Sequence, residues 1–373
     1  MNFALADDHL VLRQSARTFL EKEISLARVL VPGATVDDAG YEANWSKIAA
    51  MGWPGLVIDE AYDGLGLSCI DLAMILGEMG RSLAPSPFLG TLFGAWALQR
   101  GGSDTQKKNL LPGIAAGAVK CALAVAESHG ATDGPCREAS ARKQGVSWRL
   151  TGVKSFVIDA ASADWLIVAA HDEQAGSRAF FLVEAHQPGV EVDLLPWRDV
   201  TRQVADLRLK DAVGEKLAAA DAELWPWLRD RVLFALATES SAGAQRVMEM
   251  TVDYAKERTA FGRQIGSYQA IKHSLADMLG QVECCNAAVL YAAWALSEGD
   301  ARGPLAAAMA KAYTSDAYMA IAQRSIQIFG AIGFTWEMAN HLYFKRARAN
   351  AELFGNARTQ RARVIDMVEK KAA

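Results

Sequence analysis

The stretch Tyr254-Ala-Lys-Glu-Arg-Thr-Ala-Phe-Gly-Arg-Gln-Ile-Gly266 separates two long segments of helical character. The segment that runs into it, residues 228–258, contains no proline and only one glycine, Gly243. This predicts one helix of roughly 45 Å at a rise of about 1.5 Å per residue. After the stretch, the pattern indicates helices over 268–298, 305–329, 337–354 and 357–370. Apolar-striped helices joined by short links favour a four-helix bundle, which we place at 225–373.

The residues before this bundle divide into two regions of different periodicity. From residue 3 to about residue 116, apolar side chains recur at helical spacing. Either Ser68 or Asp71 is expected to cap one of these helices, which Pro85 and Pro87 then end. Short β-branched and aromatic runs follow at 148–151, 165–169, 179–183 and 190–192. We therefore predict an α+β fold with an N-terminal helical domain (1–118), a small β-barrel or sandwich domain (119–224) and the C-terminal bundle.

Composition excludes several classes of protein. Hydrophobic residues make up 51% and charged residues 22%, which is typical of a globular chain. The net charge of -4 leaves no basic surface for nucleic acid or for an anionic membrane. The first 20 residues lack the pattern of a signal peptide, and we expect a cytoplasmic protein without a membrane span. The five cysteines form no CxxC pair, so reduced thiols are expected and no metal site.

Four stretches, read together, resemble the acyl-CoA dehydrogenase family. They are 254–266 with Tyr268-Gln269, the turn Gln327-Ile-Phe-Gly330, the strand Leu150-Thr-Gly-Val-Lys154-Ser-Phe156-Val-Ile158-Asp159, and the loop 54–66. The resemblance implies FAD-dependent α,β-dehydrogenation of an acyl-CoA thioester to the 2-enoyl-CoA, with electrons passed to an electron-transfer flavoprotein. It implies a homo- or hetero-oligomer, a dimer or tetramer, in which a neighbouring subunit helps to hold the flavin. The sequence looks most like a divergent branch that acts on steroid, dicarboxylate or other unusual acyl-CoA substrates.

A flavin nucleotide carries a pyrophosphate, which needs cationic or N–H donors. A Rossmann fingerprint is excluded, because Cys69 stands where the third glycine would follow Gly64-Leu-Gly66. The resemblance instead implies that Arg258 pairs with the pyrophosphate, although alone it would be interpreted as a surface arginine. The other implied flavin contacts are Phe261 near the adenine, Gln269 and Gln327 as polar groups, Gly330 at close backbone approach, and Phe156, Ile158 and Ser128 beside the ring. Ile158 departs from the family pattern, which has a hydroxyl residue there.

The implied reaction needs a carboxylate that removes the α-proton of the thioester. In the commonest family pattern a glutamate precedes a glycine near the last helix, and Phe354-Gly355 stands at that position. A second family position aligns with Val232, two helical turns before Glu239. Glu239 interrupts an apolar segment and is our candidate base; Glu352 is an alternative. Equally, Glu239 could be a buried carboxylate paired with an arginine such as Arg246, Arg346 or Arg348.

Two functions remain open at this point. The chain is either an active flavoenzyme or a non-catalytic subunit that shares the flavin clamp of a heteromeric acyl-CoA dehydrogenase. A flavin-dependent oxidase or monooxygenase on the same scaffold is a third possibility, for which no residue argues. Arg202, in Asp199-Val-Thr201-Arg202, is expected to be structural or to lie at a subunit contact, and His341 is expected to be a packed or surface histidine.

Overall fold

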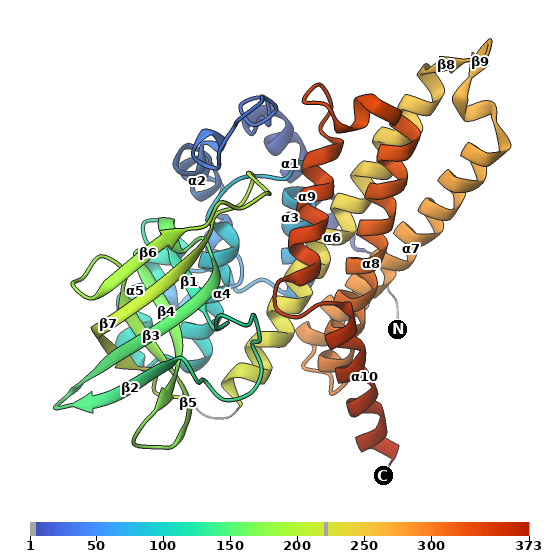
Figure 1. Ribbon diagram of the computed structural model, residues 1–373. Helices are drawn as coiled ribbons and strands as arrows, with labels where there is room; N and C mark the ends of the chain where they lie inside the picture. The colour runs from blue at the N-terminus through green and yellow to red at the C-terminus, as the bar shows by residue number, and fades with distance from the viewer. Residues whose placement is uncertain (1–4, 220–222, 373) are drawn as a thin grey trace.

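The computed structural model describes residues 5–219 and 223–372. Helices precede and follow a β domain along the chain, so the expected order of helices, sheet and helices is confirmed; the β domain lies at one side of the molecule (Figure 1). The first helices are α1 (Asp7–Glu23), α2 (Tyr41–Ala50), α3 (Cys69–Ser82), α4 (Phe88–Gly101) and α5 (Asp104–Ala115). Ser68 caps α3 by accepting from the Ile70 and Asp71 N–H groups, while Asp71 accepts from the Ser68 N–H. The two candidates for this cap therefore act together.

The middle of the chain forms a closed sheet. Its strands are β1 (Cys121–Ala124), β2 (Ala139–Gln144), β3 (Ser147–Ile158), β4 (Trp165–Asp172), β5 (Ser177–Glu184), β6 (Val190–Leu194) and β7 (Val204–Lys216). They pair in the order β1-β4-β2-β3-β7-β5, with β6 on β7. Because β5 also pairs with β4, the sheet closes on itself as a barrel. β3 joins the run predicted at 148–151 to the strand that the family resemblance indicated at 150–159, and its pairing with β7 is irregular between Leu150 and Gly152 and between Lys154 and Val157.

Five helices form the C-terminal region in the described part of the chain: α6 (Leu224–Glu257), α7 (Gln269–Ser297), α8 (Gly303–Phe329), α9 (Asn340–Glu352) and α10 (Ala357–Ala372). The single long helix predicted before residue 258 is confirmed. Between α6 and α7 the chain forms a small hairpin of β8 (Thr259–Ala260) and β9 (Arg263–Gln264), which projects from the molecule (Figure 1). α9 is shorter than predicted because a 3₁₀ turn (Gly330–Phe334) precedes it and left-handed residues follow it.

Two glycines let helices approach closely around α6. A Cβ at Gly80 would lie 2.6 Å from the Cα of Glu239, so only glycine lets α3 pack against α6 there. A Cβ at Gly243 would lie 2.6 Å from the Tyr318 hydroxyl of α8. This close packing places the middle of α6 in the interior, and Glu239 is only 5% exposed. None of the helices in the described ranges combines the length and apolar character needed to cross a membrane.

Candidate functional site

A cavity of about 420 Å³ lies between the β domain and the turn that joins α9 to α10. Its buried end is apolar and includes Leu123, Leu353 and Phe354. Exposed side chains, among them His129 and Glu352, stand at its mouth. A concave site of this size with mainly apolar walls is suited to a small organic ligand.

A bulge in β3 shapes one wall of the cavity. The pairing of β3 with β7 is irregular between Lys154 and Val157, and Phe156 has a φ of 56° there. Its N–H donates to Asp206 Oδ1 at 3.3 Å. The Phe156 ring lies in the cavity wall, 6.3 Å between centroids from the ring of Trp197. A non-glycine residue with positive φ costs energy, and such residues cluster at ligand sites.

The wall also holds an unused hydrogen-bond donor. Trp197 Nε1 is buried and has no hydrogen-bond partner in the described part of the chain, and Trp197 lines the cavity. A buried donor without a partner costs about 1–3 kcal/mol. A flavin ring is flat and apolar on its faces and carries carbonyl and nitrogen acceptors on its edge. The residues of this wall therefore fit a flavin ring.

Two carboxylates hold the loop between β1 and β2, whose residues 129–133 line the cavity. Glu127 accepts from the Arg137 N–H at 2.9 Å and from the buried Lys154 Nζ at 2.9 Å. Glu138 accepts from the N–H of Ser128 at 3.0 Å and from its hydroxyl. Burial opposes the ionisation of Glu127, but Lys154 and the Arg137 N–H outweigh it and lower its pKa. The two ends of the loop are thereby fixed against each other.

The same two carboxylates and His129 place ligand atoms within 4.8 Å of one another, the one such group found among the described residues. The Lys154 ammonium already neutralises Glu127, so an ordinary ion pair accounts for this cluster. The arrangement serves to hold the loop.

The turn between α9 and α10 forms the opposite wall. Phe354 and Gly355 have φ values of 57° and 91°, both in the left-handed region. Gln360 Nε2 donates to the Phe354 carbonyl at 3.1 Å. Lys311 Nζ donates to the carbonyls of Asn350 at 2.8 Å and Gly355 at 3.5 Å. Burial lowers the pKa of Lys311 to about 7, and the negative end of α9 helps to stabilise its charged form.

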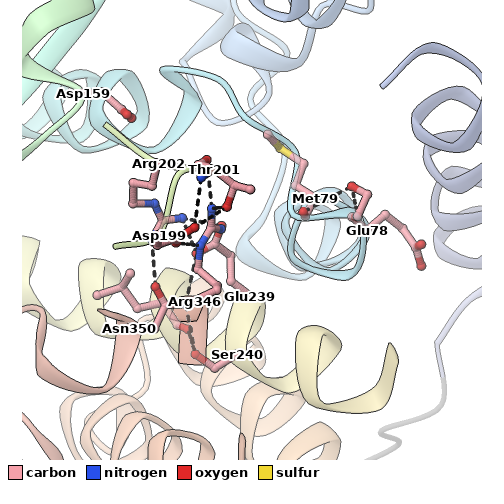
Figure 2. Close-up of polar contacts among 12 residues, drawn as sticks. Glu78, Met79, Asp159, Asp199, Thr201, Arg202, Glu239, Ser240, Arg346 and Asn350 are labelled. Atoms are coloured by element: carbon pink, nitrogen blue, oxygen red, sulfur yellow. Dashed lines mark hydrogen bonds and ion pairs between the residues drawn. The ribbon is translucent and has the colours of Figure 1, made fainter. Parts of the chain in front are cut away.

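Glu239, the candidate base, lies in a buried ionic network outside the cavity lining (Figure 2). Arg202 Nη2 donates to both of its carboxylate oxygens at 2.7 Å. Arg346 Nη1 and Asn350 Nδ2 each approach it at 3.3 Å. Arg346 also binds Asp199, whose pKa is lowered because Arg346 and Arg202 outweigh the effect of burial.

The network joins all three regions of the chain. Asp199 and Arg202 come from the loop before β7, Glu239 from α6, and Arg346 and Asn350 from α9. Tyr41 of α2 accepts from the Gln203 N–H at 2.6 Å and completes the contact with the N-terminal helices. Arg346 is one of the arginines expected to pair with Glu239 if this carboxylate is structural. The contacts favour that interpretation, and the assignment of Glu239 as the base stays a prediction.

The predicted flavin residues divide into two groups. Arg258, Phe261, Gln269, Gln327 and Gly330 are exposed, and Phe261 is 97% exposed. Packing between the ends of α6 and α8 brings the group together, since the Tyr254 ring stacks on Phe329 at 4.1 Å between centroids. This end of the helical region lies far from the β domain (Figure 1).

The second group belongs to the β domain. Phe156 lines the cavity, whereas Ile158 is buried in the sheet and Ser128 is occupied with Glu138. None of the five exposed residues at the hairpin end is among those that line the cavity, and the hairpin projects on the side of the helices away from the β domain (Figure 1).

Several buried polar residues gave no signal of their burial in the sequence. Lys154, Lys311 and Asp159 are polar residues that are completely or almost completely buried. Only their positions within apolar stretches could have indicated burial, and nothing indicated their partners. Burial also lowers the pKa of His341 to about 4, and its ring packs 4.6 Å from that of Trp336, as expected for a packed histidine.

Comparison with known proteins identifies the class of protein that this fold and site define. The model of the acyl-CoA dehydrogenase N-terminal domain matches residues 6–118, and that of the C-terminal domain matches residues 232–368. The chain therefore belongs to the acyl-CoA dehydrogenase family, whose members are flavin-dependent oxidoreductases.

Individual relatives agree with this assignment. The chain is 31% identical over 356 residues to acyl-CoA dehydrogenase IpdE2 of Mycobacterium tuberculosis, covering 94% of each. Among solved structures, it resembles a Tcur3481–Tcur3483 steroid ACAD variant with a TM-score of 0.86 and 27% identity, covering 98% of this chain and 99% of that one. The ChsE4–ChsE5 complex from Mycobacterium tuberculosis gives a TM-score of 0.88 at 25% identity, covering 99% of both chains.

Proposed function

We propose that this acyl-CoA dehydrogenase binds FAD in the cavity beside Phe156 and oxidises an acyl-CoA thioester to the 2-enoyl-CoA. The observation that carries this proposal is the cavity itself, with its apolar walls and the unpaired donor at Trp197 Nε1. When bound, FAD supplies the acceptor for the hydride from the β-carbon of the substrate. An electron-transfer flavoprotein is the proposed next electron acceptor. Four of the five free cysteines are buried, which fits a reducing compartment, and we place the enzyme in the cytoplasm.

The site is completed by a second subunit in this proposal. Phe156 and Trp197 hold the ring in one subunit, while Arg258 and its neighbours at the hairpin of the other subunit bind the pyrophosphate and adenine. The separation of the two groups within one chain supports this arrangement (Figure 1). The exposed Arg258 and Phe261 would then gain partners on assembly, as anion-binding and aromatic side chains at an interface do.

A second candidate function is supported by Phe354. This side chain cannot accept a proton, and it stands in the cavity where the family pattern leads one to expect a glutamate. Asp133, which also lines the cavity, is already bound by Arg229 at 2.6 Å and Trp225 at 2.8 Å. Glu352 at the mouth is half exposed and pairs with Arg348 at 3.1 Å. The chain would then be one subunit of a heteromeric dehydrogenase in which a partner subunit supplies the base.

The visible spectrum distinguishes these two functions. The chain is purified alone, and separately after co-expression with the product of a neighbouring dehydrogenase gene. A yellow protein that is bleached by an acyl-CoA when purified alone supports complete catalysis by this chain. A protein that becomes yellow or is bleached only with its partner supports the heteromeric function. Absence of flavin from both preparations would contradict both. A steroid-bearing thioester is included with simple acyl-CoA substrates, because one similar structure is described as a steroid ACAD.

A further inference from the structure

A second cavity, of about 300 Å³, lies among the helices. Residues of α1, α3, α6 and α7 line it, and within the described ranges the two cavities share no lining residue. Figure 2 shows Glu78, which lines this second cavity, pointing away from the ionic network around Glu239. A ligand of the second cavity is therefore bound apart from the flavin and the thioester of the proposed function.

The floor of the second cavity is apolar. Ala73 and Met74 of α3 and Val289 of α7 are each 5% exposed. A Cβ added at Gly77 would meet no other segment closer than the Ala242 side chain of α6, at 3.8 Å. The missing side chain at Gly77 therefore leaves open space between α3 and α6. A short apolar group can be buried against this floor, where it loses its contact with water.

Two arginines of α1 line the cavity, one helical turn apart. Arg17 Nε and Nη2 donate to the carboxylate of Glu78 at 2.9 Å and 2.8 Å. Arg81 lies 4.0 Å from the same carboxylate, so the charge of Glu78 is compensated. Arg13 is exposed and forms no ion pair or hydrogen bond with any described residue. Like charges four positions apart on a helix repel each other, so Arg13 beside Arg17 is a cation that lacks an anion.

Asn286 of α7 adds a neutral donor to the cavity. Ser241 Oγ of α6 donates to Asn286 Oδ1 at 2.8 Å, which orients the amide. The amide nitrogen of Asn286 donates to no group in the described part of the chain. A carboxylate only accepts hydrogen bonds, and a guanidinium binds it through two parallel N–H groups. A guanidinium and an amide NH₂ beside an apolar floor therefore fit a carboxylate that carries an apolar tail.

We propose that this second cavity binds a small monocarboxylate with a short apolar tail. Arg13 binds the carboxylate, Asn286 donates to it, and the tail packs on Met74 and Val289. Arg17 stays with Glu78, because breaking that pair would leave a buried carboxylate uncompensated. One unpaired cation is thus left for one carboxylate. A volume of about 300 Å³ lies at the lower end of the range of ligand pockets, which limits the tail to a few carbon atoms.

Isothermal titration of the purified protein, in its native oligomeric state, with acetate, butanoate and butanamide tests this inference. Affinity is expected to rise from acetate to butanoate by about fourfold for each methylene group that is buried. Butanamide has the tail of butanoate without its charge. It should bind at least about tenfold more weakly, because hydrogen bonds between charged groups are the stronger ones.

Three variants place the ligand in this cavity. Arg13→Gln should weaken butanoate binding by about tenfold or more. Ala242→Leu puts a larger apolar side chain into the cavity and should abolish binding. Lys22→Gln is the matched control, since it removes a cation that is 80% exposed on the same helix, outside the cavity. It should bind butanoate as the wild type does.

Equal butanoate affinity in the wild type and in Arg13→Gln would overturn the inference. So would equal affinities for butanoate and butanamide, or the absence of saturable butanoate binding by the wild type. Because Arg13 is exposed and unpaired, Arg13→Gln should fold, and it decides the question if Ala242→Leu does not. None of these measurements uses the flavin or a thioester, so a negative result would leave the proposed function intact.

Discussion

Arg202 donates to both carboxylate oxygens of Glu239 at 2.7 Å, joining the β domain to the longest helix of the described chain. Both side chains are buried, at 4% and 6% side-chain exposure. The pair shares its surroundings with Arg346 and Asp199, so two guanidinium groups and two carboxylates balance in charge. Such a buried pair is costly to break, because each partner left alone is an uncompensated charge. The pair therefore fixes the loop before β7 against α6 and α9.

Glu239→Gln tests this role directly. We expect the variant to lose about 3–5 kcal/mol of stability, because Arg202 keeps a buried charge without its carboxylate. The measurement is thermal unfolding, with Glu283→Gln on the exposed face of α7 as the matched control. Unchanged unfolding together with abolished flavin bleaching would instead identify Glu239 as the base.

Phe354→Glu places a carboxylate in the cavity wall. Its aromatic surroundings should raise the pKa of the new carboxyl and make it an effective proton acceptor. We expect flavin bleaching by acyl-CoA to accelerate by about 100-fold or more, the range of general base catalysis. Stopped-flow absorbance measures the rate, and Phe354→Gln has similar size without a base. Equal rates of bleaching in Phe354→Glu and Phe354→Gln would show that a missing base is not the only feature that prevents catalysis by this chain.

Asp159→Asn should change stability in a pH-dependent way. Burial raises the pKa of Asp159 to about 7, its Oδ2 accepts from the Gly90 N–H at 2.9 Å, and Oδ1 has no partner in the described residues. The unfolded carboxyl releases its proton near pH 4. The free energy of unfolding of the wild type therefore falls, relative to that of the variant, as pH rises from about 4 to 7. The asparagine variant should be more stable than the wild type at pH 8 and similar at pH 4; a constant difference across this range contradicts the prediction.

Lys311→Met should show the opposite sign. The pKa of Lys311 falls to about 7 on burial, whereas the unfolded side chain titrates near 10.4. Between these values the unfolded chain binds the extra proton, so wild-type stability rises with pH by up to about 1.4 kcal/mol per unit. Chemical denaturation from pH 6 to pH 10 should show the free energy of unfolding of the wild type rising relative to that of the variant. Parallel curves would mean that Lys311 keeps its proton throughout.

Arg258→Ala tests whether the residues at the hairpin contribute to flavin binding. Charged hydrogen bonds to a phosphate contribute about 1.5–3 kcal/mol, so flavin affinity should fall roughly ten- to a hundredfold. The ratio of flavin to protein absorbance after dialysis measures this loss. Lys256→Ala, exposed on the same end of α6, is the control. Because Arg258 is exposed, the unfolding temperature without flavin should stay unchanged; full flavin retention would remove Arg258 from the clamp.

The sequence by itself determined the helical regions, the β region between them and the long helix before Arg258. Periodicity of apolar side chains is a local property, set by which face each element buries. The family motif at 254–266 likewise indicated Arg258 and Phe261 as candidate flavin contacts, because its residues are contiguous in the chain. The absence of a carboxylate at Phe354 was also evident from the residue alone.

Only the tertiary structure decided what these residues contact. Arg202 and Glu239 are 37 positions apart in the chain, and nothing local specifies their pairing. The bulge that places Phe156 in the cavity depends on how β3 pairs with β7, and the buried Lys311 depends on the end of α9. The division of the predicted flavin contacts into two distant groups depends on the lengths of the helices and on the direction in which they pack. These features arise from contacts between remote segments, where burial and charge compensation select partners that no local pattern encodes.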